Sequence, residues 1–332
     1  MGREAVWVYA RGAFPLGKGD LMAVYTITFL GTMAYRPTES RTLVSAYVGT
    51  DDMHLIVDCG EGTQSRMVQA GITLGGETIV FVSHKHAEHF LGLFGLAITM
   101  RVMAPEARLR VFAESETLER LQTVAKALDD RFVAGLTFEP FREGVFYENR
   151  TSTLQAFPLQ HLVPSFGLVI QQKAHRPFLR SEADRLGVPE GRQRGQLAAG
   201  KTVVLESGKE ITPDQVLGQE QPGGKIVFIS DTRFFPELVG YCQGAFCVVA
   251  EATYIEKDRP LARKCGHLTA KEAATVARDA GAHMLLLTHL SGRYSEADIL
   301  AEARDVFTTA QLCRDLERIA VDLSPKAKDL GA

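Results

Sequence analysis

Three of the nine histidines in this chain lie within six positions, in the segment VFVSHKHAEHFLGL that begins at residue 80. His84 and His86 alternate, so on an extended turn both imidazoles can face one cation. Glu88 and His89 come directly after them and can face a second cation. An isolated histidine is usually an ordinary core or surface residue, but imidazoles and a carboxylate at this density suit zinc, manganese or iron. The segment therefore predicts a metal site.

Further ligand-type residues stand at the ends of apolar, β-branched segments that are typical of buried strands. These segments span residues 25–30, 54–58, 78–83, 225–230, 246–251 and 284–288. Asp231 and His289 directly follow such segments, Asp58 ends one, and His161 follows STLQAFPLQ. Sites in open α/β sheets lie beyond the carboxyl ends of strands. We therefore expect these residues along one edge of the molecule.

Helical patterns alternate with the strand segments. Residues 116–128 carry apolar side chains at helical spacing, and residues 269–282 open with a capping box of Thr269 and Glu272. A third helix is expected over 295–307, with Ser295 as its N-cap. Strands followed by helices, more than once, predict an α/β layered fold.

The composition is that of an ordinary globular protein. It argues against some classes of protein but does not indicate a function. A net charge of −3 gives no general reason to bind nucleic acid or a membrane, so either would need a local basic patch. The five cysteines form no CxxC pair, which argues against a disulfide framework and fits the cytoplasm. Residues 1–21 lack the apolar core of a signal peptide, and we expect them to be a tail before a single domain over 22–332.

Residues 173–224 differ from the rest of the chain, because they are rich in Gly, Pro and charge. Between residues 173 and 201, seven Lys and Arg residues stand against three acidic residues. Either a basic insertion or an ordinary solvated loop fits this composition.

At this point the motifs resemble a known family. SHKHAEHFLGL is similar to the HxHxDH signature of the metallo-β-lactamase superfamily, and within it to ribonuclease Z, the tRNA 3′-processing endonuclease. The motifs FLGTMAYRPTESR, VDCGEGTQ, HLVPSFG, ISDTR, EATY, GHLT and THLSGRY follow in that family's order from residue 29 onward. The resemblance implies a four-layer αβ/βα sandwich in which 173–224 is an inserted flexible arm that grips tRNA.

The resemblance also implies a two-metal site with zinc or manganese. His84, His86 and His161 would hold one ion, Glu88, His89 and His289 the other, and Asp231 would bridge them. A hydroxide between the ions would attack the phosphodiester of a precursor tRNA. His267 would protonate the leaving 3′-oxygen, Glu251 would orient His267, and Glu88 would also serve as a base. A homodimer is implied, in which one subunit's arm serves the other's site.

Substrate contacts are expected at three further places. Gly62 and Thr63, in the turn CGEGTQ, would let backbone amides approach a phosphate, although such turns are common. Arg293 would meet phosphate or form a structural ion pair. Arg192 and Arg194 in the arm would contact tRNA.

Several departures from the family pattern keep other functions open. In the parts that would read tRNA, they are Glu39, Thr42, Ala250, Leu268 and Arg192. Glu88 stands where the family has aspartate, and its extra methylene moves the carboxylate by roughly 1.5 Å, a shift large enough to affect rate. We therefore retain two alternatives to trailer removal. The first is a metallo-hydrolase that acts on a small phosphodiester, a lactone or a β-lactam, and the second is a non-catalytic descendant that binds RNA or a partner protein.

Overall fold

The structure is a computed structural model that describes residues 25–73, 76–128 and 135–323. The expected tail at 1–21 lies outside these residues. Among the described residues, the strands form two seven-stranded sheets and a separate two-stranded ribbon. No helix in this part of the chain is long and apolar enough to cross a membrane.

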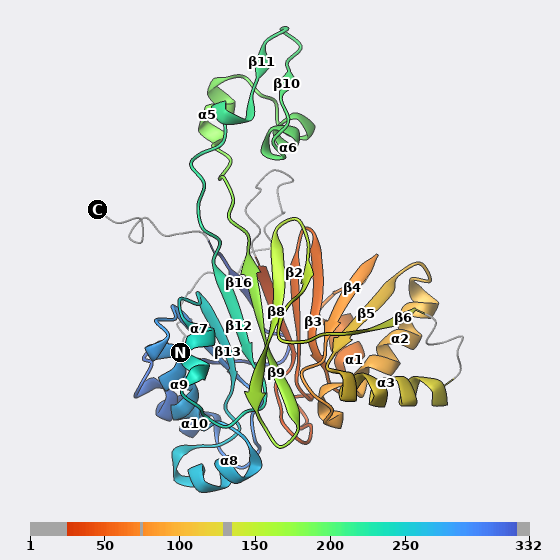
Figure 1. The fold of residues 1–332 in the computed structure, drawn as a ribbon, viewed down its shortest axis with the longest axis vertical. Helices are drawn as coiled ribbons and strands as arrows, with labels where there is room; N and C mark the ends of the chain where they lie inside the picture. Colours follow the sequence, from red (N-terminus) through yellow and green to blue (C-terminus); the bar gives the residue numbers. More distant parts are fainter. Residues whose placement is uncertain (1–24, 74–75, 129–134, 324–332) are drawn as a thin grey trace, which may run out of the picture.

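The two large sheets face one another (Figure 1). The order of the first is β16 (Arg318–Val321), β1 (Tyr25–Gly31), β2 (Ser45–Thr50), β3 (Met53–Cys59), β4 (Glu77–Phe81), β5 (Arg108–Ala113) and β6 (Leu136–Pro140). The order of the second is β15 (Gln311–Leu312), β14 (Met284–Thr288), β13 (Cys247–Glu251), β12 (Lys225–Ile229), β9 (Pro164–Gln172), β8 (Ser152–Gln160) and β7 (Gly144–Glu148). Each sheet has a parallel half, β3 to β6 and β12 to β15.

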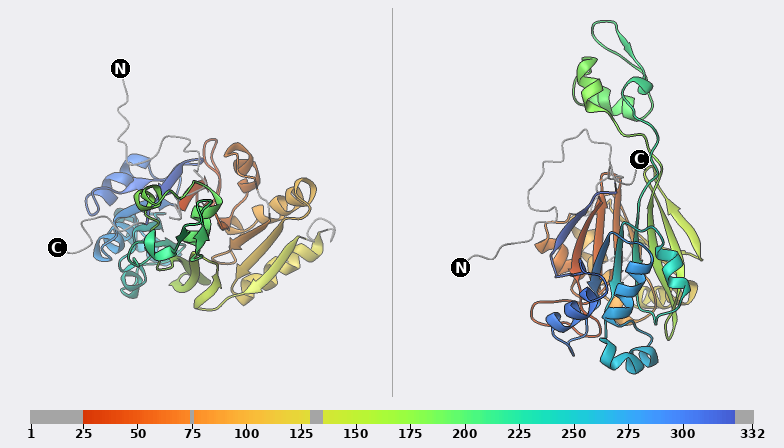
Figure 2. Two further views of the ribbon diagram at one scale, coloured as in Figure 1. Left: turned by 90° about the horizontal axis from the view of Figure 1, so that it is seen from above. Right: turned by 90° about the vertical axis from the view of Figure 1, so that its left-hand side faces the viewer.

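Helices cover the outer face of each sheet, so the molecule has four layers (Figures 1 and 2). On the first sheet lie α1 (Thr63–Gln69), α2 (Gly92–Met103) and α3 (Ser115–Ala127). On the second lie α7 (Glu237–Cys242), α9 (Ala270–Asp279) and α10 (Glu296–Arg304), while α8 (Arg259–Cys265) sits near the end of that sheet. The expected αβ/βα sandwich is confirmed.

The layers are held by two apolar cores. Between the sheets, Phe29 and Phe81 of the first sheet pack in one cluster with Ile170 and Phe228 of the second. Outside the second sheet, the side chains of α9 that face it are mainly alanines, which let the helix approach β13 and β14 closely. Burial of this much apolar surface is the main force that aligns the strand ends of the two sheets.

The expected strands and helices are confirmed, with ends that differ by a few residues. Each of the six predicted strand segments matches a strand, β1, β3, β4, β12, β13 or β14. The capping box of Thr269 and Glu272 is present at α9, and the helix ends before Gly281, whose φ is 68°. Ser295 caps α10 by accepting from Asp298 N.

The arm leaves the body between β9 and β12 and forms a small folded unit at one end of the molecule (Figure 1). It contains α5 (Arg180–Arg185), α6 (Arg192–Ala198), β10 (Val203–Val204) and β11 (Glu210–Ile211). Six apolar side chains form its own core, Ala183, Val188, Leu197, Val203, Ile211 and Val216. The sequence pattern concealed this core, because its members come from very short elements.

Candidate metal centre

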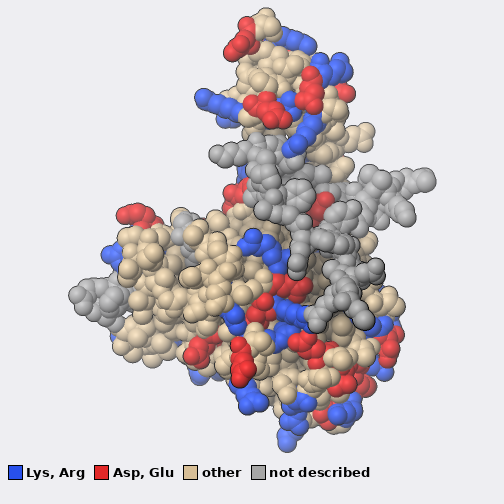
Figure 3. All heavy atoms as spheres, turned by 180° about the vertical axis from the view of Figure 1, so that it is seen from behind, with Lys and Arg blue, Asp and Glu red and all other residues tan. Residues whose placement is uncertain are grey.

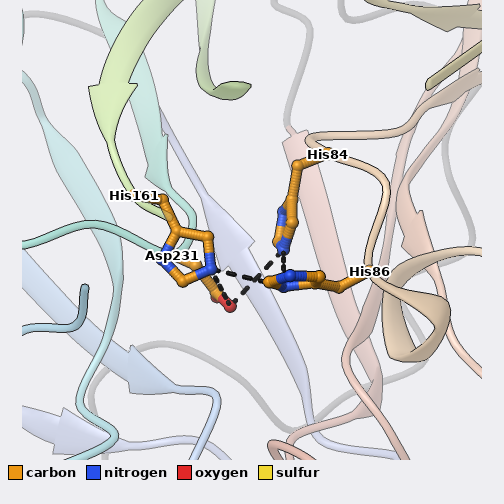
Figure 4. Close-up of side chains that lie close together, drawn as sticks. All are labelled: His84, His86, His161 and Asp231. Atoms are coloured by element: carbon orange, nitrogen blue, oxygen red, sulfur yellow. Dashed lines mark hydrogen bonds and ion pairs between the residues drawn. The ribbon is translucent and has the colours of Figure 1, made fainter. Parts of the chain in front are cut away.

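The ligand-type residues meet where strands of both sheets end. His84 and His86 follow β4 of the first sheet, whereas His161 follows β8 and Asp231 follows β12 of the second. Figure 4 shows their side chains pointing from opposite sides toward one place. His289 reaches the same place from the end of β14. The expectation that strand ends bring these residues together is correct.

Four of these side chains form a first group that fits one ion. Nε2 of His84 lies 3.0 Å from Nδ1 of His86, which lies 3.3 Å from Nε2 of His161. Oδ2 of Asp231 lies 3.6 Å from the His84 nitrogen and 3.9 Å from the His161 nitrogen. The four donor atoms are all within 4.8 Å of one another, as ligands around a single ion must be.

A second group adjoins the first and shares its carboxylate. Oδ2 of Asp231 lies 3.4 Å from Nε2 of His89, and Oδ1 lies 3.3 Å from Nε2 of His289. All three side chains are buried. A carboxylate between two sets of imidazoles is the arrangement that a bridging ligand requires.

The second nitrogen of each buried imidazole is held by a hydrogen bond. Nδ1 of His89 donates to Asp58 at 2.8 Å, and Asp58 also accepts from the Ser83 amide. Nδ1 of His161 donates to the Gly266 carbonyl at 2.8 Å. Nδ1 of His289 lies 2.9 Å from the Thr253 hydroxyl. Such partners fix the ring orientation and leave the other nitrogen for a metal.

The atoms that face the centre of the cluster lack hydrogen-bond partners within the described chain. They are Nε2 of His89, Nε2 of His289 and both carboxylate oxygens of Asp231. Buried polar atoms are nearly always paired, so unpaired ones that point to one spot need an explanation. A cation there would satisfy all four atoms, and the residues therefore fit a metal.

The protonation states of three ligand histidines suit metal binding, whereas at His89 burial is outweighed by the carboxylates of Asp58 and Asp231, which raise the pKa well above its usual range. Burial, together with neighbouring imidazoles, lowers the pKa of His84 and of His86, and burial lowers the pKa of His289 to about 4. These rings are neutral near pH 7, the form in which histidine binds metals. Although burial alone raises the pKa of Asp231, the surrounding histidines outweigh it and hold that pKa well below its usual range.

The backbone is strained at the centre. Among the described residues, four other than glycine have positive φ, and three of them touch this region: Tyr35 at 47°, Asp58 at 54° and His289 at 54°. Side chains disfavour this conformation, and strain of this kind concentrates at functional sites.

A histidine–carboxylate pair lies beside the second group. Nδ1 of His267 lies 3.0 Å from Oε1 of Glu251, and both residues are buried. Burial lowers the pKa of His267, but the carboxylates of Glu251 and Asp231 outweigh it and raise that pKa to about 9. His267 is therefore positioned to hold a proton near pH 7, as a general acid must.

Glu88 differs from the other predicted ligands. It lies on the short helix Ala87–His89, is partly exposed, and belongs to neither group of converging ligand atoms. Its charge still acts on His86 and His289, so its carboxylate is near the centre. Its role as a ligand remains a prediction.

The three residues expected to contact phosphate lie in two separate segments. Gly62 has a φ of 94° at the start of α1, and the Thr63 hydroxyl donates to the Gly60 carbonyl at 2.7 Å. The exposed Arg293 lies on the loop after β14, close to Tyr254.

The two arginines predicted to contact tRNA occupy different environments in the arm. Arg192 is exposed. Arg194 is only 9% exposed, and its guanidinium donates to the Val188 carbonyl at 2.7 Å and to Asp184 at 2.5 Å. Arg194 therefore stabilises the arm itself.

Tyr35 is a residue of this region that the motifs did not reveal. Its hydroxyl lies 2.7 Å from Nε2 of His267, and its ring stands edge-on to that imidazole. A tyrosine within a turn-like segment carries no sequence signal of this contact, because the contact depends on a left-handed backbone that tyrosine rarely adopts.

Comparisons with known proteins agree with this geometry. A family model described as Beta-lactamase superfamily domain matches residues 207–290, and one described as Anti-Pycsar protein Apyc1 matches residues 25–179. Ribonuclease Z of Bradyrhizobium diazoefficiens is 35% identical over 304 residues, which cover 90% of this chain and 100% of that protein.

Two solved structures share the fold. The metallo-β-lactamase fold protein YhfI of Bacillus subtilis has a TM-score of 0.65 at 16% identity, covering 90% of this chain and 100% of that one. The short form of human tRNase Z has a TM-score of 0.59 at 21% identity, covering 89% and 98%. The chain therefore belongs to the ribonuclease Z family of metal-dependent hydrolases with the metallo-β-lactamase fold.

Proposed function

We propose that this chain is an endoribonuclease that removes 3′ trailers from precursor tRNA with two divalent ions, zinc or manganese, in its active site. The observation that carries the proposal is the pair of ligand groups that share Asp231, together with the unpaired buried atoms of Asp231, His89 and His289. Family membership supports the same reaction.

In this proposal, the residues around Asp231 divide between the two ions. His84, His86 and His161 hold the first, and His89 and His289 hold the second. When bound, such ions lower the pKa of water and neutralise charge on the scissile phosphate. Glu88, partly exposed beside both groups, accepts the proton of the attacking water, since its carboxylate lies outside the converging ligand atoms.

His267 acts at the other side of the phosphate. Its imidazolium donates a proton to the 3′-oxygen as the bond from that oxygen to phosphorus breaks. Glu251 orients the ring through Nδ1 and stabilises its charge, while the Thr232 amide donates to the same Glu251 oxygen at 2.9 Å. The Glu251 carboxylate is thus held in place from two sides.

The place of the arm supports a homodimer. The arm begins after Gln172, which pairs with Ser152 at the start of β8, whereas His161 follows the end of β8. With about 3.3 Å per residue, the nine residues of β8 separate the arm's root from the metal centre by about 30 Å. Figure 1 shows the arm extending away from the end of the sheets at which β8 ends and the metal centre lies. An arm so placed serves the site of a second subunit better than its own.

A face with few charged side chains offers a surface for that second copy. Val68 on α1 and Val102 and Met103 on α2 are largely exposed apolar residues. Figure 3 shows that the part of the surface at its left, on the side of the first sheet's helices, carries few Lys, Arg, Asp or Glu side chains. Charged patches of both signs cover much of the remaining surface in that view, so this face favours association with another copy.

The test compares substrates and variants. Wild-type protein with zinc or manganese should cleave a precursor tRNA, and Asp231→Ala should lose at least about 100-fold in kcat/KM. His54→Ala, which changes a histidine bonded to Tyr47 outside the metal centre, should retain cleavage. If only bis(p-nitrophenyl) phosphate were hydrolysed, the small-phosphodiester alternative would replace the tRNA assignment.

A further inference from the structure

Tyr35, in the loop that follows β1, covers His267, the proposed general acid. Half of its side chain is exposed, yet its hydroxyl lies 2.7 Å from Nε2 of His267. The side chain of Tyr254 lies close to the same hydroxyl. Its ring also stands edge-on to His289, with 6.3 Å between the centroids. Tyr35 therefore stands between solvent and the catalytic pair.

The nitrogen that Tyr35 contacts is the one through which His267 must act. Nδ1 of His267 is held by Glu251 at 3.0 Å, so Nε2 is the position from which a proton can leave the ring. A ring N–H points in one direction and makes one well-aligned hydrogen bond. The Tyr35 oxygen therefore occupies the position in which a leaving oxygen would accept that proton.

The backbone favours displacement of Tyr35 by the substrate. The preceding residue is anchored, since the Ala34 amide donates to the Leu290 carbonyl at 2.9 Å. Tyr35 itself begins an exposed tip, residues 35–40, and its φ of 47° is a conformation that disfavours a side chain. Because Tyr35 is strained and begins an exposed tip, its displacement costs little free energy.

We propose that Tyr35 is a cap on His267 that the substrate displaces, and that its hydroxyl thereby lowers the apparent affinity of the active site for phosphodiesters. The inference rests on the proposed role of His267 as general acid. After displacement, the leaving oxygen takes its proton directly from Nε2 of His267, so Tyr35 gains and loses no proton. Capped enzyme cannot bind substrate productively, and the observed affinity falls in proportion.

Tyr35→Phe tests the cap because it removes the hydroxyl and keeps the ring. A single hydrogen bond changes an equilibrium constant by about three- to tenfold. The variant should lower KM by about that factor, with kcat changed by less than about twofold, for precursor tRNA and for bis(p-nitrophenyl) phosphate. Tyr47→Phe, which removes a hydroxyl bonded at 2.5 Å to His54, should leave both constants unchanged.

Other outcomes overturn the cap. If kcat falls for precursor tRNA but not for bis(p-nitrophenyl) phosphate, whose leaving group needs no acid, the hydroxyl relays the proton instead. An unchanged or raised KM would mean that the contact has no capping role. The small diester keeps the test independent of the tRNA assignment. Binding of inorganic phosphate to the metal-loaded enzyme, measured by calorimetry, should likewise tighten about three- to tenfold in Tyr35→Phe.

Discussion

Removal of metal should destabilise this protein strongly, because the metal centre is buried within the fold. Four buried atoms, two on Asp231 and one each on His89 and His289, lack partners in the described chain. An unsatisfied buried polar atom costs about 1–3 kcal/mol, so the four together cost on the order of 4–12 kcal/mol. For a domain of this size, each kcal/mol shifts Tm by about 2 °C. Chelation should therefore lower Tm by at least about 8 °C.

Differential scanning calorimetry measures this shift, with zinc or manganese added back to the chelated protein. Asp231→Asn should abolish the response to metal, because both groups depend on that carboxylate. Glu88→Gln should retain the response, since Glu88 lies outside both groups. A wild-type Tm that is the same with and without chelator would refute the reasoning, and loss of the response in Glu88→Gln would make Glu88 a ligand after all.

Three further predictions concern catalysis and the arm. Glu88→Gln should lower kcat by about 100-fold or more while two ions per chain remain bound, as counted by elemental analysis. Although burial lowers the pKa of His267, the Glu251 carboxylate raises it to about 9. Activity should therefore fall as the pH rises through about 9, and Glu251→Gln should move this fall to lower pH in a pH–rate profile. Arg192→Ala should weaken tRNA binding and make that binding less dependent on salt. Arg194→Ala removes the contacts with Val188 and Asp184 and should therefore increase proteolysis of the arm.

Much of the metal centre was predictable because the signals that locate its residues lie in short stretches of sequence. A β-branched segment predicts where a strand ends, and His84, Asp231 and His289 stand within three residues of such ends. The capping box at Thr269 likewise depends on neighbours in the chain. Parallel strands then bring their carboxyl ends to one edge, so the convergence follows from the fold class.

The rest depends on contacts between distant segments. The burial of Arg194 results from the folding of the arm around Val188 and Asp184, while the sequence shows only a basic residue in a charged segment. The place of Glu88 depends on a difference of one methylene, which no pattern resolves. The contact of Tyr35 with His267 joins residues 232 positions apart and requires a backbone conformation unusual for tyrosine.

The central claim is that this dinuclear site cleaves precursor tRNA, and mapping the cut tests it most directly. Metal-loaded protein would be incubated with a precursor tRNA that carries a 3′ trailer, and both ends at the cut would be identified. The account predicts a cut at the 3′ end of the tRNA body that leaves a 3′-hydroxyl, because His267 protonates the 3′-oxygen. Intact precursor with two ions bound per chain, or a product that ends in a 3′-phosphate, would contradict it.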